Sequence, residues 1–412
     1  MMKNKIYIID VTNRDAVQAS RILIPKLSKT LINIYLDQMG VYQSEMGFPA
    51  LSHEANYINA NLELAKVGGI KRLRLEGWCR AMPQDIELTF KNCPTIRHLN
   101  VSLPTSDIMI KAKFQGRKTW KDIVKLLAAT VLSAKEKGVE TLAISAEDAS
   151  RTELDKLIEF GIAGKEAGAV RFRYSDTLGA DEPLAIYEKI KVISGATGLP
   201  VELHCHNDIG MAVAVSIAGA QGATEQGHDA YINTTINGYG ERAGNCDLVS
   251  VLLALKYSSD LKNKVFCDES IDLVQSWKIA RYASHAFNIP IPLNQPGVGA
   301  NAFAHESGIH ADGTLKDRRS YELYAPEAIG RGMPELFETG RIITTGAYSG
   351  IKGFRHVYGK LGIDFRDDGE ARKILSLVQY ANLHTQKPLM DDELKLIANF
   401  PDIVARILTV TP

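Results

Sequence analysis

Eight short apolar, β-branched segments alternate with helical segments between the start of this chain and Asn237. Strands that alternate with helices favour βαβ units and a parallel sheet. Eight of them at about 30-residue spacing predict an α/β protein with a closed (β/α)8 TIM barrel rather than an open doubly wound sheet. The predicted strands are Ile6–Asp10, Val41–Gly47, Leu73–Trp78, His98–Leu103, Thr141–Glu147, Val170–Asp176, Val201–His206 and Tyr231–Asn237.

The length of the chain leaves room for more than a barrel. A barrel of this kind takes about 250 residues, so we expect residues 1–260 to form the catalytic domain. Residues 261–412 contain a connector rich in proline and glycine at 289–299, and helical patterns on either side of it. We predict that they form a C-terminal, mainly helical subdomain. No G-x-G-x-x-G follows the first strand, which argues against a dinucleotide-binding fold.

Composition excludes several classes of partner. The chain has 48 basic and 48 acidic residues, so no charge excess suggests binding to nucleic acid or to an anionic membrane surface. No apolar run reaches the length of about 18 residues that a membrane span needs, and no apolar leader precedes the first strand. The five cysteines are an odd number without C-x-x-C spacing, which fits reduced thiols in the cytoplasm.

Polar residues follow the predicted strands. In a (β/α)8 barrel the ends of all the strands meet at one rim, where active sites lie. A single acidic residue at a strand end is more often a helix N-cap than a catalyst, but polar ends on all eight strands together indicate a substrate site. They are Thr12–Asp15, Glu45, Arg80, Ser102, Glu147–Asp148, Asp176–Gly179, His204–His206 and Asn237–Asn245.

The sequence Leu203-His204-Cys205-His206 closes the seventh predicted strand. Residues two apart on a strand point to the same face, so both imidazoles face the same side. Two imidazoles at a strand end suit a divalent metal ion. The alternative is a pair of histidines that are merely exposed there. The other polar strand ends favour the metal.

Three motifs carry a family resemblance. Asp10-Val11-Thr12-Asn13-Arg14-Asp15-Ala16-Val17-Gln18 resembles the D-x-T-x-R-D-G-x-Q opening of the DRE-TIM metallolyases. Residues 204–210 resemble their H-x-H-N-D-x-G, and residues 237–245 resemble the N-G-x-G-E-R-x-G-N loop of the Claisen-condensing branch. Within that branch, Ser102–Asp107, Glu147–Arg151 and His305–His310 look most like homocitrate synthases of the nitrogen-fixation type and the related Re-citrate synthases.

The resemblance implies a set of site residues. Asp15, His204, His206 and Asn245 would bind a divalent metal, Mg²⁺ or Mn²⁺ in preference to Co²⁺ or Zn²⁺. The metal would chelate the 2-oxo acid, and Arg14 would stabilise the developing alkoxide. The resemblance further assigns His310 and Tyr321, supplied by a neighbouring subunit of a homodimer, to proton transfer. It places Glu147 in the catalytic set and assigns substrate contacts to Gln18, Glu45, Ser145 and Thr177.

The chain departs from the family pattern at three places. Ala16 replaces a glycine, which raises the question of whether that turn needs a positive φ. Ala143 stands where an arginine binds the far carboxylate of 2-oxoglutarate in lysine-pathway homocitrate synthases. We therefore predict that Arg80 binds that carboxylate instead; the alternative is that Arg80 only pairs with Glu76 or Asp85 on the rim. Residues 345–350 replace a G-K-H-S-G motif.

The resulting prediction is a metal-dependent acyltransferase. It would condense acetyl-CoA with a 2-oxo dicarboxylate and release CoA, giving homocitrate from 2-oxoglutarate or citrate from oxaloacetate. Alternatives are an enzyme like 2-isopropylmalate or citramalate synthase, a carbon–carbon lyase on the same barrel, and a non-catalytic metal-binding paralogue. The presence of Arg14, Asp15 and both histidines argues against the last of these.

Overall fold

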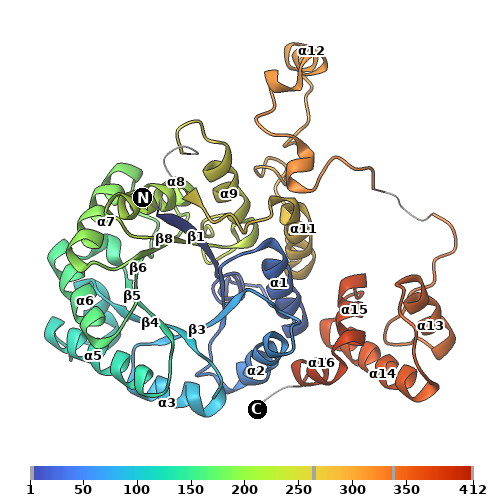
Figure 1. The fold of residues 1–412 in the computed structure, drawn as a ribbon, viewed down its shortest axis with the longest axis horizontal. Helices are drawn as coiled ribbons and strands as arrows, with labels where there is room; N and C mark the ends of the chain where they lie inside the picture. Colours follow the sequence, from blue (N-terminus) through green and yellow to red (C-terminus); the bar gives the residue numbers. More distant parts are fainter. Residues whose placement is uncertain (1–3, 262–265, 336–338, 410–412) are drawn as a thin grey trace.

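The computed structural model describes residues 4–261, 266–335 and 339–409. Its centre is a closed parallel barrel in which each of the first eight strands pairs with the next, and β1 lies between β8 and β2 (Figure 1). All eight predicted strands are confirmed, with shifts of a few residues at their ends. They are β1 (Lys5–Asp10), β2 (Gln43–Gly47), β3 (Arg74–Arg80), β4 (His98–Pro104), β5 (Thr141–Glu147), β6 (Arg171–Asp176), β7 (Val201–Cys205) and β8 (Ala230–Thr234).

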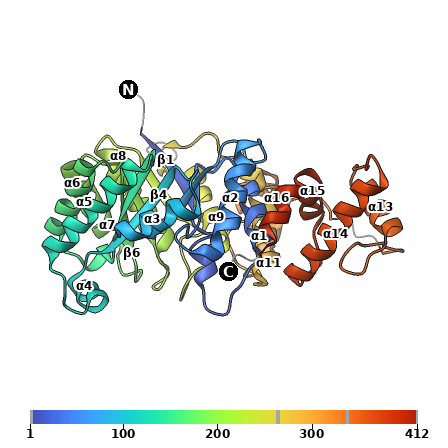
Figure 2. The ribbon, with the colours of Figure 1, turned by 90° about the horizontal axis from the view of Figure 1, so that it is seen from below.

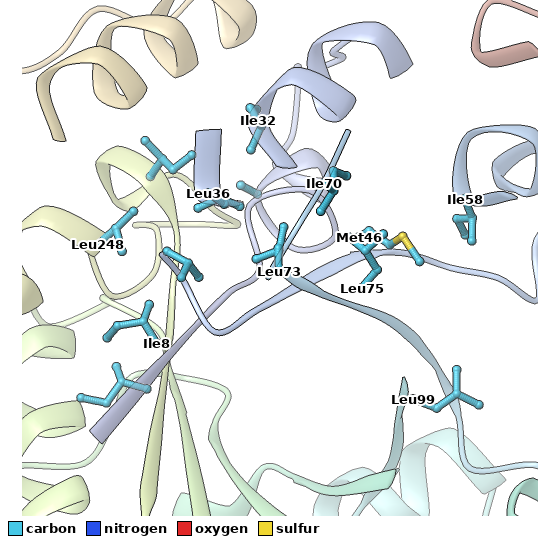
Figure 3. Close-up of a cluster of buried hydrophobic side chains, with 14 of the residues drawn as sticks. Ile8, Ile32, Leu36, Met46, Ile58, Ile70, Leu73, Leu75, Leu99 and Leu248 are labelled. Carbon is cyan, nitrogen blue, oxygen red and sulfur yellow. The ribbon is translucent and has the colours of Figure 1, made fainter. Parts of the chain in front are cut away.

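Helices surround the barrel on its outer side (Figure 1). The strands present apolar residues to these helices, and Figure 3 shows Ile8, Leu75 and Leu99 among the buried side chains of that layer. An extra helix, α4, lies in the connection after β4, and Figure 2 shows it projecting from the barrel. The barrel helices are α1 (Lys26–Met39), α2 (Ser52–Lys66), α3 (Pro83–Asn92), α4 (Asp107–Phe114), α5 (Trp120–Glu136), α6 (Leu154–Ala167), α7 (Pro183–Thr197), α8 (Ala212–Glu225) and α9 (Leu248–Tyr257).

The inside of the barrel is charged rather than aliphatic. Barrels of this fold usually fill their interior with branched apolar side chains. Here Arg171 bridges Glu76 and Glu202 at 3.1 and 3.0 Å. Arg173 lies 2.6 Å from Glu45 and from Glu202. All five side chains are buried. Each of these polar groups therefore depends on its neighbours for the interactions that water would otherwise provide.

Three tyrosines close the barrel below this charged layer. Tyr7, Tyr42 and Tyr231 have ring centroids 4.7–5.3 Å apart. The guanidinium of Arg171 lies 4.8 Å from the ring centre of Tyr231, which links the aromatic floor to the ion pairs above it by a cation–π contact. The floor and the ion pairs together leave the opposite end, at the carboxyl ends of the strands, as the open end of the barrel.

The chain beyond the barrel is mainly helical, as predicted. A two-residue strand, β9 (Phe266–Cys267), pairs with β1, and α11 (Ser276–Phe287) packs on α1. The last four helices, α13 to α16, then form a group that contacts α1 and α2 through α15 and α16 (Figure 1). The predicted boundary at residue 260 stays a prediction. The further helices are α12 (Gly308–Lys316), α13 (Ile351–Lys360), α14 (Asp368–Thr385), α15 (Asp391–Asn399) and α16 (Pro401–Ile407).

Residues 305–323, which include α12, form an arm that extends away from the barrel (Figure 1). No residue of α12 is buried, and Ile309, Leu315 and Leu323 are exposed. Among the described residues, no helix is long and apolar enough to cross a membrane.

Candidate active site

A cavity of about 220 Å³ opens at the carboxyl ends of the strands. Its wall contains eight of the residues predicted from the sequence, which come from β1, β5, β6 and β7 and the loops that follow them. They are Arg14, Asp15, Gln18, Ser145, Glu147, Thr177, His204 and His206. A ninth, Glu45, is hydrogen-bonded to the Nε of Arg14.

Asp15, His204 and His206, which the sequence predicts as metal ligands, lie together in the wall of the cavity. The Nε2 atoms of His204 and His206 lie 3.5 and 3.9 Å from the Oδ2 of Asp15. Each residue offers one ligand atom, and these three atoms lie within 4.8 Å of one another. All three residues are buried. Two imidazole nitrogens and a carboxylate oxygen converging at one point fit a divalent cation.

The tautomer of His204 follows from a chain of hydrogen bonds. The carboxylate of Glu202 can only accept, so the Nδ2 of Asn233 donates to it at 2.7 Å. The Oδ1 of Asn233 then faces the Nδ1 of His204 at 3.0 Å and must accept its proton. The Nε2 of His204 therefore carries a lone pair that points toward Asp15. Such a support is typical of histidines that bind metals.

The electrostatics keep these groups in the states that ligate a cation. Burial lowers the pKa of His204 to about 3, and burial also lowers the pKa of His206, so both rings are neutral at neutral pH. Burial acts to raise the pKa of Asp15, but Arg14, together with the two histidines once they are protonated in acid, outweighs it and holds that pKa well below its usual value. A carboxylate and two neutral imidazoles result.

Asn245 belongs to the same cluster but presents its amide nitrogen. The Nδ2 of Asn245 donates to the Oδ2 of Asp15 at 2.6 Å, while its Oδ1 is buried and has no partner among the described residues. A Cβ at Gly240 would lie 1.7 Å from that Oδ1, so any larger residue there would displace the amide of Asn245. Ligation of a metal through the Oδ1 would require the amide to rotate by half a turn.

Arg14 is fixed by two carboxylates. Its Nε donates to Glu45 and its Nη1 donates to Asp15 at 2.6 Å, and Glu45 is in turn paired with Arg173. The side chain is buried, and within the described residues its Nη2 has no hydrogen-bond partner. Arg14 therefore offers one free donor beside the predicted metal site. The turn that carries it needs no positive φ: Ala16 begins a short 3₁₀ helix and is not among the positive-φ residues.

Six further residues line the cavity. Arg242 is bonded to Asp208 at 2.8 Å and to the carbonyl of Thr177 at 2.6 Å. The six are Trp78, Ser102, Arg173, Ser175, Glu241 and Arg242. Ser102, Glu241 and Arg242 belong to the polar strand ends that indicated this rim, but Trp78, Arg173 and Ser175 were not predicted as site residues.

Three predicted site residues lie elsewhere in this chain. Arg80 forms two hydrogen bonds of 2.8 Å with Asp85, and its side chain is 71% exposed. His310 and Tyr321 stack on each other in the arm, with ring centroids 4.1 Å apart. Neither lines the barrel cavity. Their roles stay predictions.

Two family models match the sequence. The model of the HMGL-like family matches residues 5–282. The chain belongs to the HMGL-like family. A second model, of the homocitrate synthase post-HMGL domain-like family, matches residues 298–384 and so covers the arm as well as α13 and most of α14.

Full-length relatives are also found. The chain is 56% identical to Citrate (Re)-synthase of Dehalococcoides mccartyi, over 99% of each chain. It is 33% identical to Homocitrate synthase 1 of Nostoc sp., over 95% of this chain and 96% of the relative. Among solved structures, hydroxymethylglutaryl-CoA lyase from Pseudomonas aeruginosa matches with a TM-score of 0.57 and 14% identity, covering 70% of this chain and 95% of that one. This last likeness supports the barrel fold alone.

Proposed function

We propose that this protein is a metal-dependent acyltransferase that condenses acetyl-CoA with oxaloacetate and water to give citrate and CoA. The observation that carries the proposal is the buried Asp15–His204–His206 cluster beside Arg14, in a chain 56% identical to a Citrate (Re)-synthase over nearly its whole length. Homocitrate formation from 2-oxoglutarate is the second candidate, favoured by the match to the homocitrate synthase domain model and by the relative from Nostoc.

A divalent cation fits the site because three ligand atoms converge there and both imidazoles are neutral. Asp15, His204 and His206 would hold it, and Asn245 would join them after rotation of its amide. Once bound, such a cation supplies Lewis-acid polarisation of the keto group of the 2-oxo acid. Mg²⁺ and Mn²⁺ suit a site of mixed nitrogen and oxygen ligands, while Co²⁺ and Zn²⁺ remain alternatives to be tested.

Arg14 takes the role of the electrostatic stabiliser. As the methyl carbon of acetyl-CoA bonds to the keto carbon, the keto oxygen gains negative charge. The free Nη2 of Arg14 is positioned to donate to that oxygen, because Glu45 and Asp15 already hold the rest of the guanidinium. A donor that needs no rearrangement at the moment of reaction is an effective form of transition-state stabilisation.

His310 and Tyr321 would remove the methyl proton of acetyl-CoA. An imidazole suits this reversible transfer at neutral pH. The two side chains lie in the exposed arm rather than in the cavity. We therefore propose a homodimer in which the arm of one subunit reaches the cavity of the other. The exposed apolar residues Ile309, Leu315 and Leu323 support this, because such residues gathered on one segment are typical of protein interfaces.

Release of free CoA, measured with a thiol reagent, tests the proposed function. Acetyl-CoA is combined with oxaloacetate, 2-oxoglutarate, pyruvate or 2-oxoisovalerate, with Mn²⁺ or Mg²⁺ present or removed by a chelator. Metal-dependent CoA release with oxaloacetate supports the proposal. Preference for 2-oxoisovalerate or pyruvate would make the protein an isopropylmalate- or citramalate-synthase-like enzyme. Cleavage of a 3-hydroxyacyl-CoA in place of condensation would make it a lyase.

We infer a cytoplasmic location from the state of the cysteines. Four of the five cysteines, Cys79, Cys93, Cys205 and Cys246, are free and buried. This agrees with the predicted cytoplasmic location, in which thiols stay reduced.

A further inference from the structure

Three arginines line the cavity, and they differ in what they can bind. Arg14 lies beside Asp15, so its free donor faces the predicted metal site. Arg242 is bonded to Asp208 and to the loop after β6, with more than a third of its side chain exposed. Arg173 is the third, and its side chain is 1% exposed. An acid with two carboxylates needs a second cationic receptor in addition to the metal, and these arginines are its candidates.

Arg173 has one nitrogen to spare. Its hydrogen bonds and ion pairs within the described chain all involve Nε and Nη2, which contact Glu202 at 2.6 Å and Glu45 at 2.6 Å. Its Nη1 takes part in none of them. Arg173 lines the cavity, and a buried N–H group left without a protein partner requires an acceptor from elsewhere. The guanidinium is held rigidly by its other contacts, so the direction of this donor is fixed before any ligand arrives.

Three serines lie beside Arg173 in the sheet. Ser145 is the strand neighbour of Arg173, and Ser102 is the neighbour of Ser145 on its other side. Ser175 lies two residues beyond Arg173 on the same face of β6 and pairs in register with His204. The hydroxyl groups of Ser145 and Ser175 are 3.0 Å apart. All of these residues line the cavity, so a corner of hydroxyls with one arginine donor faces the same space as the metal ligands.

The spacing of the strands sets the length of the molecule that can bridge the two sites. Neighbouring strands are about 4.8 Å apart. His204 on β7 is therefore one strand from Ser175 and two from Ser145, a distance of roughly 5–10 Å. A four-carbon 2-oxo dicarboxylate whose keto end lies at Asp15, His204 and His206 extends its far carboxylate into this interval. A monocarboxylate such as pyruvate would leave the corner empty.

We infer that Arg173, with the hydroxyls of Ser145 and Ser175, binds the far carboxylate of the 2-oxo acid and selects for dicarboxylates. The inference rests on the proposed function and names the residues that give it substrate specificity. It assigns to the barrel interior the role that the sequence suggested for Arg80. Arg80 would have to leave Asp85 to serve as this receptor.

The test compares kcat/KM for oxaloacetate and for pyruvate, and uses their ratio as the readout. In Arg173→Lys the charge remains but the fixed Nη1 is lost, and we expect the ratio to fall by about 10–100-fold. In Ser145→Ala one neutral hydrogen bond is lost, and we expect a fall of about 3–10-fold. Ser145→Ala leaves the ion pairs intact, so it keeps the test decisive if Arg173→Lys does not fold.

Arg171→Lys is the matched control. Arg171 is on the same strand and shares Glu76 and Glu202 with Arg173, but it does not line the cavity. We expect Arg171→Lys to lower the unfolding temperature as Arg173→Lys does, with the substrate ratio unchanged. A ratio that falls equally in both variants would mean that the ion pairs act only through stability.

Two other outcomes would overturn the inference. In the first, the ratio of kcat/KM values is unchanged in both Arg173→Lys and Ser145→Ala. In the second, Arg80→Leu alone abolishes the preference for oxaloacetate, in which case Arg80 is the receptor. These outcomes differ from failure of the proposed function, which would show as a wild-type protein that releases no CoA with any 2-oxo acid.

Discussion

The barrel rim and the arm hold the two halves of the proposed chemistry, and one chain completes only the first. At the rim, Asp15 and His204 are buried and each is held by a hydrogen-bonded neighbour. In the arm, His310 and Tyr321 contact each other by stacking, and the helix that carries His310 has no buried residue. A site that is rigid before its ligand arrives can act within one subunit. An exposed pair gains a fixed position only when another surface packs on it.

The largest expected effect is at the rim. His204→Ala removes a metal ligand and leaves Asp15 without the imidazole at 3.5 Å. Changes in the hydrogen-bonded supports of a metal ligand typically cost 10–100-fold in affinity, so loss of a ligand itself should cost more than about 100-fold and abolish turnover. Calorimetric titration with Mn²⁺ measures the affinity directly.

His356→Ala is a suitable control, because His356 is an exposed histidine on α13. It should bind Mn²⁺ as the wild type does. A His204→Ala protein with wild-type Mn²⁺ affinity would show that the cluster is not the metal site.

The arm gives the next effect. His310→Ala should lower kcat by about 10²–10⁴-fold, the usual contribution of a general acid or base, while the binding of oxaloacetate with Mn²⁺ stays near the wild-type value. The oxo acid is expected at the rim, which the substitution does not touch. Steady-state kinetics and calorimetry on the same preparation separate the two quantities.

Mixed dimers sharpen this comparison. If the arm of one subunit serves the cavity of the other, a mixture of inactive His204→Ala and His310→Ala chains, refolded or co-expressed, contains dimers with one intact site. We expect such a mixture to recover activity. A mixture that stays as inactive as its components would place both halves of the site in one chain.

The sequence allowed the residues of the rim to be predicted, but it did not show which acidic side chain pairs with each arginine. His204 and His206 were assigned to one face by strand alternation alone, and their ring nitrogens do converge on Asp15. The same alternation in Arg171-Phe172-Arg173 carried a signal that the barrel interior is charged, but composition cannot say which acids balance these arginines. Arg80 shares the inward face of β3 with Glu76, yet Asp85, five residues on, holds it at the rim.

The arm shows a different limit. Helices were expected only beyond residue 313, whereas α12 already begins at Gly308. What the arm contacts depends on surfaces beyond its own sequence. The motif His305–His310 could therefore suggest a function, but not a position.

A smaller effect concerns the support of His204. Asn233→Ala should leave the ligands in place but remove the acceptor that fixes the proton on the Nδ1 of His204. We expect Mn²⁺ affinity to fall by about 10–100-fold, less than for His204→Ala. Asn233→Thr keeps a hydroxyl that can accept from His204 and donate to Glu202, so it should retain more of the affinity. Equal losses in the two variants would mean that Asn233 contributes by packing rather than by orienting the imidazole.

The smallest effect is on stability and comes from Glu76 in the charged layer. Burial raises the pKa of Glu76 to about 8, with Arg171 opposing the shift. Between the usual carboxyl pKa and about 8 the folded state thus holds a proton that the unfolded state has lost. Stability is then highest in acid and falls as the pH rises through this window. Glu76→Gln mimics the protonated form, so its unfolding temperature should vary less between pH 5 and about 8.5, by a few degrees.

Glu202→Gln provides the contrast for Glu76. Arg173 and Arg171 outweigh the effect of burial and lower the pKa of Glu202, so that residue is charged throughout the same range. Its neutral replacement leaves two buried arginines short of a partner and should destabilise the protein at every pH, by about 3–5 kcal/mol. If Glu76→Gln instead behaves like Glu202→Gln, Glu76 is ionised at neutral pH. The charged layer would then carry a net negative charge that favours the cation at Asp15.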